Sequence, residues 1–364
     1  MNIDLQLRAG DWVEVRTKEE IVRTLDVKGQ LDGLPFMPEM FAFCGRRFRV
    51  FKRAHKTCDT ATGAATGVYK GRRMKETVHL DGIRCDGSSH GGCEAGCLIF
   101  WKLAWLQKVS DSKEDPGMRS DDPDEGKIRC TEKDVLNRAV NFGNGETVPT
   151  YICQTTSIPN ATEPLSPWDL RQYFQDISSR NVGLGRMANG FLYMAYKWLA
   201  LRMRGGRILR YLYDRSAGLR GGYPFPRKHG KILIGSQTPS VQLNLREGEL
   251  VRVKSYEAIL ATCDAANKNR GMVFDAEMVP YCGRTFRVLK RVTKILNEST
   301  GRMQQLKNPC IILDGVTCQS RYSECRLFCP RSIYPYWREI WLERVSKPSV
   351  EVAHVSAPGE CAVI

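Results

Sequence analysis

The first hundred residues alternate between short hydrophobic segments and polar stretches rich in glycine. Segments of β-branched and aromatic residues separated in this way predict the strands of a small antiparallel sheet or barrel. One stretch differs, because residues 18–25 carry apolar side chains at helical spacing and predict a short helix after the first strand. The strands expected from this pattern are residues 12–15, 48–51, 78–80 and 105–106.

The middle of the chain has a helical period. Ser166 followed by Pro167 predicts a helix start, since serine caps the first turn and proline fits the first position. A second helix is expected over residues 187–203, ending before the glycine pair 205–206. In the first of these helices the apolar side chains that follow at helical spacing are Leu170, Tyr173, Phe174 and Ile177.

The pattern of the first hundred residues returns near the end of the chain. Residues 10–56 align without a gap on residues 248–294, and 20 of the 47 positions are identical. Such a match over a gapless stretch indicates an internal duplication. The match resumes with LDGIRC (80–85) against LDGVTC (313–318) and closes with WKLAWLQKV (101–109) against WREIWLERV (337–345).

These patterns predict a mainly β protein of two homologous small modules, each an SH3-like barrel, with a central α-helical insert. A less specific α+β module is the alternative for each copy. The segment from Ser110 to Asp134 holds nine acidic against five basic residues, which is typical of a solvated linker. The expected divisions are a first repeat over 1–109, an acidic linker and irregular segment over 110–164, a basic helical insert over 165–246, a second repeat over 247–346 and a flexible tail over 347–364.

Composition places the chain among globular proteins. Its 364 residues suffice for two or three domains, and the apolar and charged fractions of 42% and 26% are ordinary. The longest apolar run, residues 191–201, contains Lys197 and is shorter than the roughly 20 residues of a membrane-spanning helix. No basic segment followed by an apolar one opens the sequence, so we expect no secretory signal and a cytoplasmic, reducing location.

The sequence has fourteen cysteines, which in a reducing compartment more often bind metal or carry chemistry than form disulfides. Four thiols per repeat match the needs of one tetrahedral metal ion, and structural zinc would stabilise a module with a small core. The sequence therefore predicts one zinc site in each repeat. The matched positions are Cys44, Cys85, Cys93 and Cys97 in the first copy and Cys282, Cys318, Cys325 and Cys329 in the second.

The spacing of these cysteines leaves alternatives open. Zinc sites usually contain a pair separated by two residues, whereas seven residues separate Cys85 from Cys93 and six separate Cys318 from Cys325. An iron–sulfur cluster uses the same four thiolates, and Cys329 followed by proline resembles the end of some ferredoxin motifs. Buried free thiols or disulfides are the remaining alternative.

The first repeat carries three chemically active side chains that the second lacks, at His55, Cys58 and His90. Thr293 stands in the position of His55, and the glycine-rich loop around His90 has a bulkier counterpart. A thiolate beside an imidazole, or a metal with an open position, is an arrangement used in catalysis, so these three residues are catalytic candidates. The alternative is structural, because His55 and Cys58 would face opposite sides of an extended strand.

A basic segment over residues 180–231 contains twelve Lys and Arg against one acid, Asp214, with aromatic residues in between. Such a segment suits an acidic partner, which could be nucleic acid, an anionic membrane surface or an acidic carrier protein. A packed helix with solvated arginines is the simpler alternative. The nucleotide-binding, GxSxG and HExxH motifs are absent from the sequence.

Four segments of the chain stand out together: GDWVEVRTKEEI, LPFMPEMFAFCGRRFRVFKRAHKTCD, LDGIRCDGSSHGGCEAGCLIFW and CPRSIYPYWREIWLERV. They resemble a family of uncharacterised bacterial proteins with tandem cysteine-rich repeats, found near peptide or polysaccharide biosynthetic genes. The resemblance implies a cytoplasmic bacterial protein with a biosynthetic role. We therefore expect a metal-binding protein, a metalloenzyme or accessory of a specialised-metabolite or polysaccharide pathway, with its active site in the first repeat. The alternative is a non-enzymatic nucleic-acid-binding protein with zinc-stabilised barrels.

Overall fold

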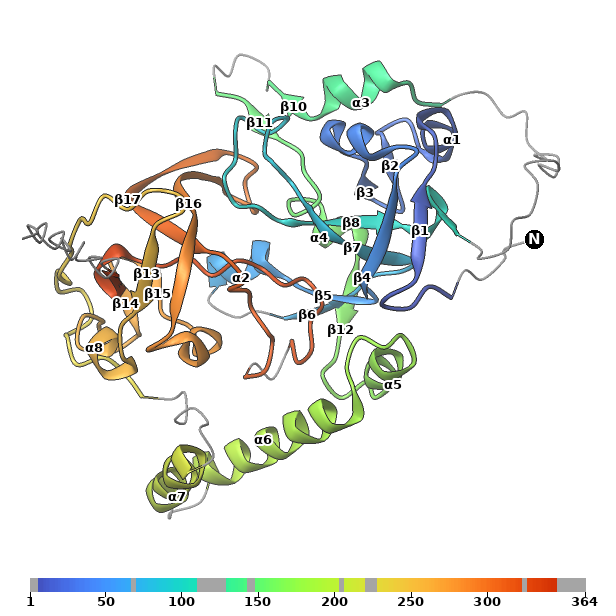
Figure 1. Cartoon of the computed structure of the whole chain (residues 1–364). Helices are drawn as coiled ribbons and strands as arrows, with labels where there is room; N and C mark the ends of the chain where they lie inside the picture. The colour runs from blue at the N-terminus through green and yellow to red at the C-terminus, as the bar shows by residue number, and fades with distance from the viewer. Residues whose placement is uncertain are drawn as a thin grey trace, which may run out of the picture.

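In the computed structural model two β modules lie side by side, and helices of the insert run along one edge (Figure 1). Residues 110–128 of the predicted acidic linker, the whole of the predicted tail over 347–364 and Cys325 lie outside the described residues. The structure describes residues 6–66, 70–109, 129–142, 148–202, 206–219, 228–322 and 326–345.

The first module is built on an antiparallel sheet with the strand order β8-β7-β4-β1-β9. The strands expected at 12–15, 48–51 and 78–80 are confirmed. The expectation for Trp105 is wrong, because its indole turns inward to Thr24 Oγ1 at 3.1 Å and the residue lies in the 3₁₀-helix η2 (Leu103–Trp105). The strands are β1 (Trp12–Val15), β4 (Arg47–Arg53), β7 (Thr77–Arg84), β8 (Leu98–Lys102) and β9 (Leu106–Lys108).

The second module has an equivalent sheet with the order β17-β16-β13-β18. Its register matches that of the first module, since Val13 pairs with Phe48 and, at the duplicated positions, Val251 pairs with Phe286. The chain is therefore a mainly β protein of two modules that share the order of four strands, whereas an isolated bridge between Ile311 and Trp337 stands in the described part of the second module where β8 pairs in the first. The strands are β13 (Leu250–Val253), β16 (Thr285–Leu296), β17 (Met303–Leu313) and β18 (Leu342–Arg344).

Each module adds a short helix after its first strand. The helix expected over 18–25 is α1 (Lys18–Thr24), where Thr17 and Glu20 form a capping box. Its counterpart is α8 (Tyr256–Leu260), capped by Ser255. The remaining short elements of the modules are β2 (Gln30–Leu31), β3 (Leu34–Pro35), η1 (Pro38–Phe43), α2 (Thr60–Thr66), β14 (Lys268–Asn269), β15 (Met272–Val273), η3 (Ala276–Tyr281) and η4 (Glu339–Trp341).

The core of each module contains a phenylalanine packed edge-to-face against two fully buried tryptophans. Phe36 lies 6.3 Å from Trp101 and 5.2 Å from Trp105, measured between ring centroids. Such pairs each add about 0.5–1.5 kcal/mol beyond the burial of their area. The duplicated positions therefore build the same core twice, since Phe274 of the second module packs in this way on Trp337 and Trp341.

The segment before the insert is an ordered layer of the first module in its described part, and not the irregular chain expected. Its last strand joins a three-stranded sheet with the order β12-β6-β5. Gln154 holds the segment to the sheet, because its side chain accepts from the Phe100 amide and donates to the Phe100 carbonyl, both at 2.8 Å. The first repeat contributes β5 (Lys56–Cys58) and β6 (Gly71–Arg73) to this sheet. The elements of the segment itself are α3 (Glu132–Arg138), β10 (Val140–Asn141), β11 (Thr150–Tyr151), α4 (Ile158–Ala161) and β12 (Glu163–Leu165).

The insert is helical, as the sequence predicts. Its first helix begins later than the serine–proline pair suggested, because Asp169 accepts from the Arg171 amide at 3.1 Å and organises the first turn there. None of the helices in the described ranges has the length and apolar character needed to cross a membrane. The helices are α5 (Arg171–Ser178), α6 (Leu184–Arg202) and α7 (Gly206–Leu219).

Candidate metal centre

A narrow cavity lies where the cysteine-rich loop of the first module meets the ordered segment before the insert and the second module. Its volume is about 30 Å³, enough for one or two water-sized groups. Cys85, Cys93 and Cys97 line it, so the fold brings three of the matched cysteines of the first repeat to one place. Further polar lining residues are His90, Cys153, Gln154, Thr155 and Glu298.

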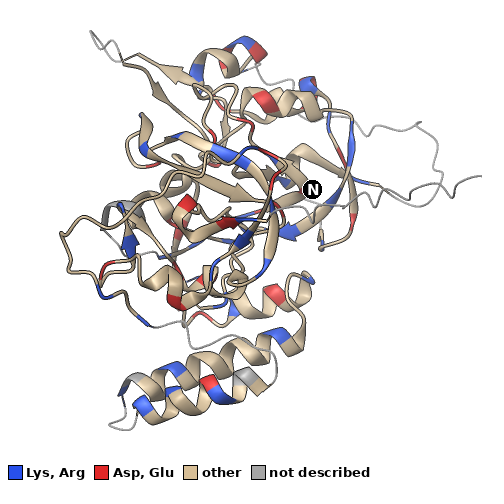
Figure 2. Ribbon diagram, turned by 60° about the vertical axis from the view of Figure 1, so that its left-hand side comes forward, with Lys and Arg blue, Asp and Glu red and all other residues tan. Residues whose placement is uncertain are grey.

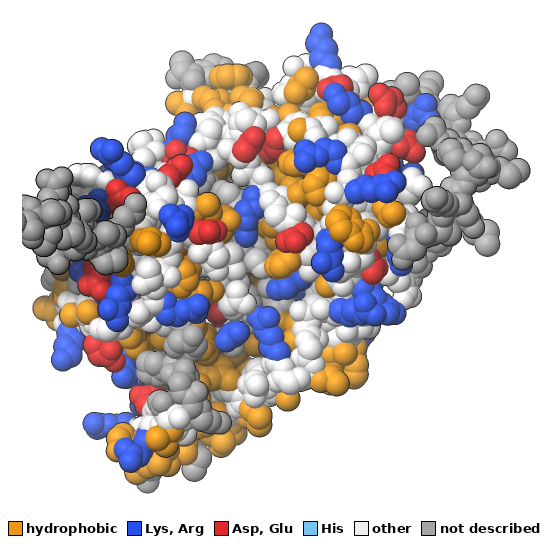
Figure 3. All heavy atoms as spheres, in the orientation of Figure 1, with side chains coloured by type: hydrophobic (Ala, Val, Ile, Leu, Met, Phe, Trp, Pro, Cys, Tyr) orange, Lys and Arg blue, Asp and Glu red, His pale blue; other side chains and the backbone are white. Residues whose placement is uncertain are grey.

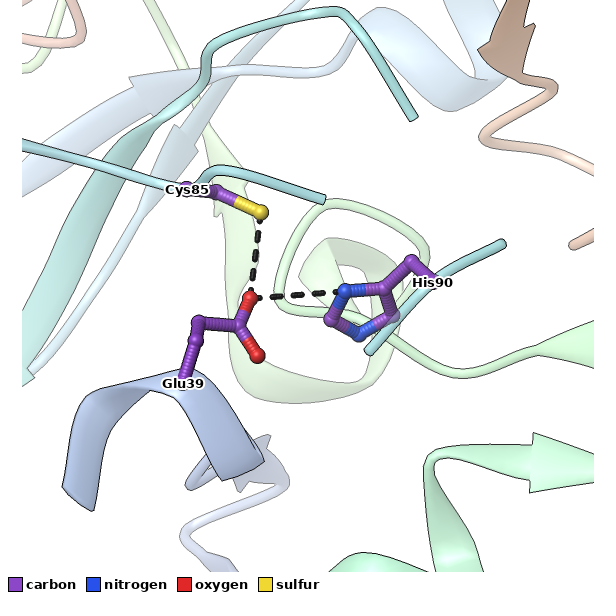
Figure 4. Close-up of side chains that lie close together, drawn as sticks. All are labelled: Glu39, Cys85 and His90. Atoms are coloured by element: carbon purple, nitrogen blue, oxygen red, sulfur yellow. Dashed lines mark hydrogen bonds and ion pairs between the residues drawn. The ribbon is translucent and has the colours of Figure 1, made fainter. Parts of the chain in front are cut away.

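Two of the lining residues, Cys85 and His90, converge on the carboxylate of Glu39, which lies beside them (Figure 4). The Cys85 thiol donates to Glu39 Oε1 at 3.1 Å, and His90 Nδ1 lies 3.4 Å from the same oxygen. The possible ligand atoms of the three residues all lie within 4.8 Å of one another. In the part of the chain that the structure describes, this is the group of His, Cys, Asp or Glu side chains whose spacing suits a metal ion.

Local structure places Glu39 and Cys85. Glu39 lies in the 3₁₀-helix η1, which begins with Pro38 because a proline there leaves no backbone N–H without a partner. Cys85 follows the end of β7, where its amide donates to the Cys97 carbonyl at 2.8 Å. A rigid turn and a strand end thus hold the carboxylate and the thiol against each other.

A tightly folded loop places His90. The amides of His90 and Gly92 both donate to the Gly87 carbonyl at 2.9 Å. Gly87 has a φ of +78°, and a Cβ at this position would lie 2.0 Å from the Cys93 carbonyl oxygen. Only glycine fits there, so the glycine-rich sequence of the loop is what turns the imidazole toward Glu39.

The backbone contact of His90 Nε2 decides which ring nitrogen faces Glu39. His90 Nε2 lies 3.1 Å from the Ile152 carbonyl oxygen, which can only accept, so Nε2 carries a proton. Nδ1 is therefore the nitrogen left to bind a metal ion, and a carbonyl behind the ring is the usual support of a metal-bound imidazole. Among the described residues, the other carboxylate oxygen, Glu39 Oε2, is buried without a hydrogen-bond partner, and a bound cation would satisfy it.

Burial and charge set the protonation of the other two groups. Burial alone would raise the pKa of Glu39, but the hydrogen bond and charge of His90 outweigh it and hold that pKa below its ordinary value. Burial, together with the Glu39 charge, raises the pKa of the Cys85 thiol far above its ordinary value. At neutral pH Glu39 is a carboxylate and Cys85 a thiol, which would lose its proton on binding a metal ion.

The other matched cysteines of the first repeat lie outside the group of three. Cys93 Sγ accepts from the Leu296 amide at 3.3 Å and so contacts the second module. Burial raises the pKa of Cys97 to about 12. Cys44 does not line the cavity, and burial raises the pKa of its thiol to about 11 in spite of the charge of Lys18. A site made of all four thiols is not assembled among the described residues, and it stays a prediction.

The second module keeps the carboxylate and the thiol of this group but not the imidazole. Glu277 and Cys318 occupy the positions of Glu39 and Cys85. Tyr322 lies three residues before Cys325, as His90 lies three residues before Cys93. The Tyr322 amide donates to Glu277 Oε1 at 2.6 Å. Burial raises the pKa of Glu277 above its ordinary value. Because Cys325 lies outside the described residues, the site predicted from Cys282, Cys318, Cys325 and Cys329 stays a prediction.

His55 lies away from the metal group, against helix α5. Its Nε2 is 3.1 Å from the Gln172 carbonyl oxygen and 3.3 Å from Asp176 Oδ1. Lys56 binds the other oxygen of the same carboxylate at 2.5 Å, and all three charged or polar side chains are buried. His55 therefore helps to hold the insert against the first module.

Cys58 has a third set of neighbours, in the second module. A hydrogen bond from the Cys329 thiol, together with the charge of Arg331, lowers the pKa of Cys58 in spite of burial. Neither His55 nor His90 takes part in this contact. Of the three catalytic candidates, the structure brings only His90 to the metal group.

Glu39 is a member of this candidate group that the cysteine pattern of the sequence did not indicate. A signal was available, because Glu39-Met40 and Glu277-Met278 are identical pairs within the duplicated stretch. The pattern of four matched thiols does not include this carboxylate, which comes from a different segment. The carboxylate becomes visible only when η1 and the cysteine-rich loop are packed together.

Comparison with protein families, with curated proteins and with solved structures found no match to this chain. The class of this protein is therefore inferred from its own fold and site geometry. Fold and site together define a two-module, mainly β protein with a buried carboxylate–thiol–imidazole group that could hold a metal ion.

Proposed function

We propose that Glu39, Cys85 and His90 bind one zinc ion and that the protein acts through this centre. Zinc accepts carboxylate oxygen, thiolate sulfur and imidazole nitrogen. The observation that carries the proposal is the convergence of three possible ligand atoms, one from each residue, within 4.8 Å of one another. Beside them, Glu39 Oε2 is buried and has no hydrogen-bond partner among the described residues. A bound cation would neutralise the carboxylate and give the imidazole lone pair an acceptor.

Three protein ligands leave one of four tetrahedral positions open, which is the arrangement of catalytic zinc sites. A water or a substrate carbonyl in that position would be polarised by the metal, which suits hydrolysis or acyl transfer. We therefore favour a cytoplasmic bacterial metalloenzyme, or its accessory, in a specialised-metabolite or polysaccharide pathway. The loss of the imidazole at Tyr322 supports the first repeat as the active one.

Two alternatives have weaker support. An iron–sulfur cluster would use thiolates such as Cys85, Cys93 and Cys97, but a cavity of about 30 Å³ suits a single ion better. A non-enzymatic nucleic-acid-binding role would use the basic insert, whose exposed face is largely apolar. We also propose that each module is an SH3-like barrel, supported by the register shifts at which β4 and β16 bend.

Metal analysis of the purified full-length protein tests the proposal. We expect one zinc ion per chain, a colourless solution, and loss of this zinc in Glu39→Gln and His90→Ala. Glu277→Gln is the matched control, because it makes the same change in the repeat without the imidazole, and it should keep the zinc. Full metal content in both first-repeat variants would overturn the proposal, and a brown protein with iron and sulfide would support the cluster instead.

A further inference from the structure

The long helix α6 of the insert turns its apolar residues outward. The side chains of Leu184, Leu192 and Trp198 are 71%, 67% and 55% exposed. With the other exposed apolar residues of α6 they recur at the spacing of one face of the helix. A surface helix normally buries such an apolar face. The members of this exposed stripe are Leu184, Ala188, Phe191, Leu192, Ala195, Trp198 and Leu199.

The opposite face of α6 is the one that packs on the protein. Met187 joins a small core with Phe328 of the second module. A Cβ on Gly190 would lie 2.4 Å from that phenylalanine ring, so the ring presses directly on the helix backbone. Lys197 is only 3% exposed, so the face that packs inward includes a charged residue. These contacts fix the rotation of α6 about its own axis. The exposed stripe therefore faces the solvent because the opposite face is packed.

The apolar surface continues onto the neighbouring helices. Figure 3 shows hydrophobic side chains along the lower edge of the molecule, where Figure 1 places α5, α6 and α7. Monomeric soluble proteins usually expose apolar residues singly, whereas here they form a continuous patch. The further exposed members, before and after α6, are Trp168, Leu170, Phe174, Ile208, Tyr211, Leu212 and Leu219.

Positive charge borders this surface. Helices α6 and α7 contain a single acidic residue, Asp214, which Lys228 approaches at 3.8 Å. Arg202, Arg207 and Arg215 are exposed on the same two helices, and Figure 2 shows how basic residues predominate on them. A ligand of this surface must accept large apolar side chains and arginines together.

We propose that the helical insert docks on an anionic lipid bilayer, with α6 lying parallel to the membrane surface. The apolar stripe would enter the boundary between headgroups and acyl chains, while the arginines contact anionic headgroups. The 19 residues of α6 make a helix roughly 28 Å long, which suffices for a stable interfacial contact.

The charge distribution favours this occupant over the others. A second copy of the chain would bring arginines of the same surface against one another, which opposes association. Nucleic acid would pair with the arginines but would leave leucine and isoleucine side chains against a charged backbone. An anionic bilayer satisfies both components of the surface.

Co-sedimentation of the full-length protein with lipid vesicles tests the proposal. We expect strong binding to vesicles of phosphatidylcholine mixed with phosphatidylglycerol, weaker binding to phosphatidylcholine alone, and a decrease with added salt. The double variant Leu192→Ser/Trp198→Ser should bind at least about tenfold more weakly, because two apolar side chains that would enter the bilayer are removed. Both positions are exposed, so the variant should keep its fold and its circular dichroism spectrum.

The matched control is Phe142→Ser, which removes an exposed aromatic residue distant in sequence from the insert and should bind like the unchanged protein. Absence of binding to anionic vesicles at low salt would overturn the proposal. Equal binding of the double variant and the control would also overturn it. So would a dimer, or a complex with RNA, that forms through Leu192 and Trp198 while vesicles are not bound.

Discussion

Arg331 of the second module donates from Nη1 to the Cys58 carbonyl oxygen of the first module at 3.2 Å. The guanidinium is fully enclosed, with 2% of its side chain exposed, and its Nη2 binds Glu298 Oε1 at 3.1 Å. It also donates to Thr60 Oγ1 at 2.5 Å. One buried cation thus binds groups of both modules, so the duplicated halves form a joint structure around it.

We expect Arg331→Ala to destabilise the protein by about 3–5 kcal/mol, because it leaves the partners of a buried ion pair without hydrogen bonds. Urea unfolding of the full-length chain measures this change. Arg344→Ala is the control, since its pair with Glu249 is 49% exposed on the arginine side and contributes less than about 1 kcal/mol. Similar losses in the two variants would contradict the role of Arg331 between the modules.

Zinc binding should strengthen as the pH rises. The pKa of Cys85 is raised above its ordinary value, so the thiol must release a proton when the metal binds. Below that pKa the affinity should rise about tenfold per pH unit. Glu39, whose pKa is lowered, is already ionised and adds no slope in the neutral range. Competition with a coloured chelator at several pH values measures the affinity.

The variant Cys85→Ser separates this proton from other effects. It should bind zinc more weakly, because a hydroxyl is a poorer ligand than a thiolate, and most of the pH slope should disappear. An affinity of the unchanged protein that does not vary with pH would show that Cys85 is not a ligand.

We expect Gly87→Ala to lose zinc and stability together. The added Cβ would meet the Cys93 carbonyl at 2.0 Å, so the loop that carries His90 cannot keep its shape. Gly82→Ala is a matched control, because Gly82 has a similar φ of +71° but nothing within 4 Å of an added Cβ. The control should cost about 1–2 kcal/mol from backbone strain and keep its zinc. Normal zinc content in Gly87→Ala would contradict the loop geometry.

His55→Thr should leave the zinc content unchanged. Thr293 occupies the duplicated position, and His55 contacts Asp176 of α5 and not the metal group. We expect a loss of about 1–2 kcal/mol, because Lys56 still binds the carboxylate after the imidazole is removed. Elemental analysis and thermal unfolding provide the two measurements. Release of the metal by this substitution would place His55 in the centre after all.

Much of the fold follows from the sequence. The strand at 12–15 and the helix beginning at Lys18 were readable because alternation, capping and turn residues act over a few neighbouring positions. The duplication added the prediction that both halves share one arrangement. The equal registers of Val13 with Phe48 and Val251 with Phe286 follow from it, since the same side chains must face the same kind of core.

The composition of the metal group was decided by the tertiary structure. Glu39 and His90 come from η1 and a distant loop, and no local period connects them. The orientation of α6 was decided in the same way, because a helical stripe of apolar residues has the same spacing whether it faces the core or the solvent. The contact of Phe328 with Gly190 turns that stripe outward. Strands, helices and caps depend on neighbouring residues. The convergence of the ligand side chains and the orientation of α6 depend on which segments distant in the sequence pack together.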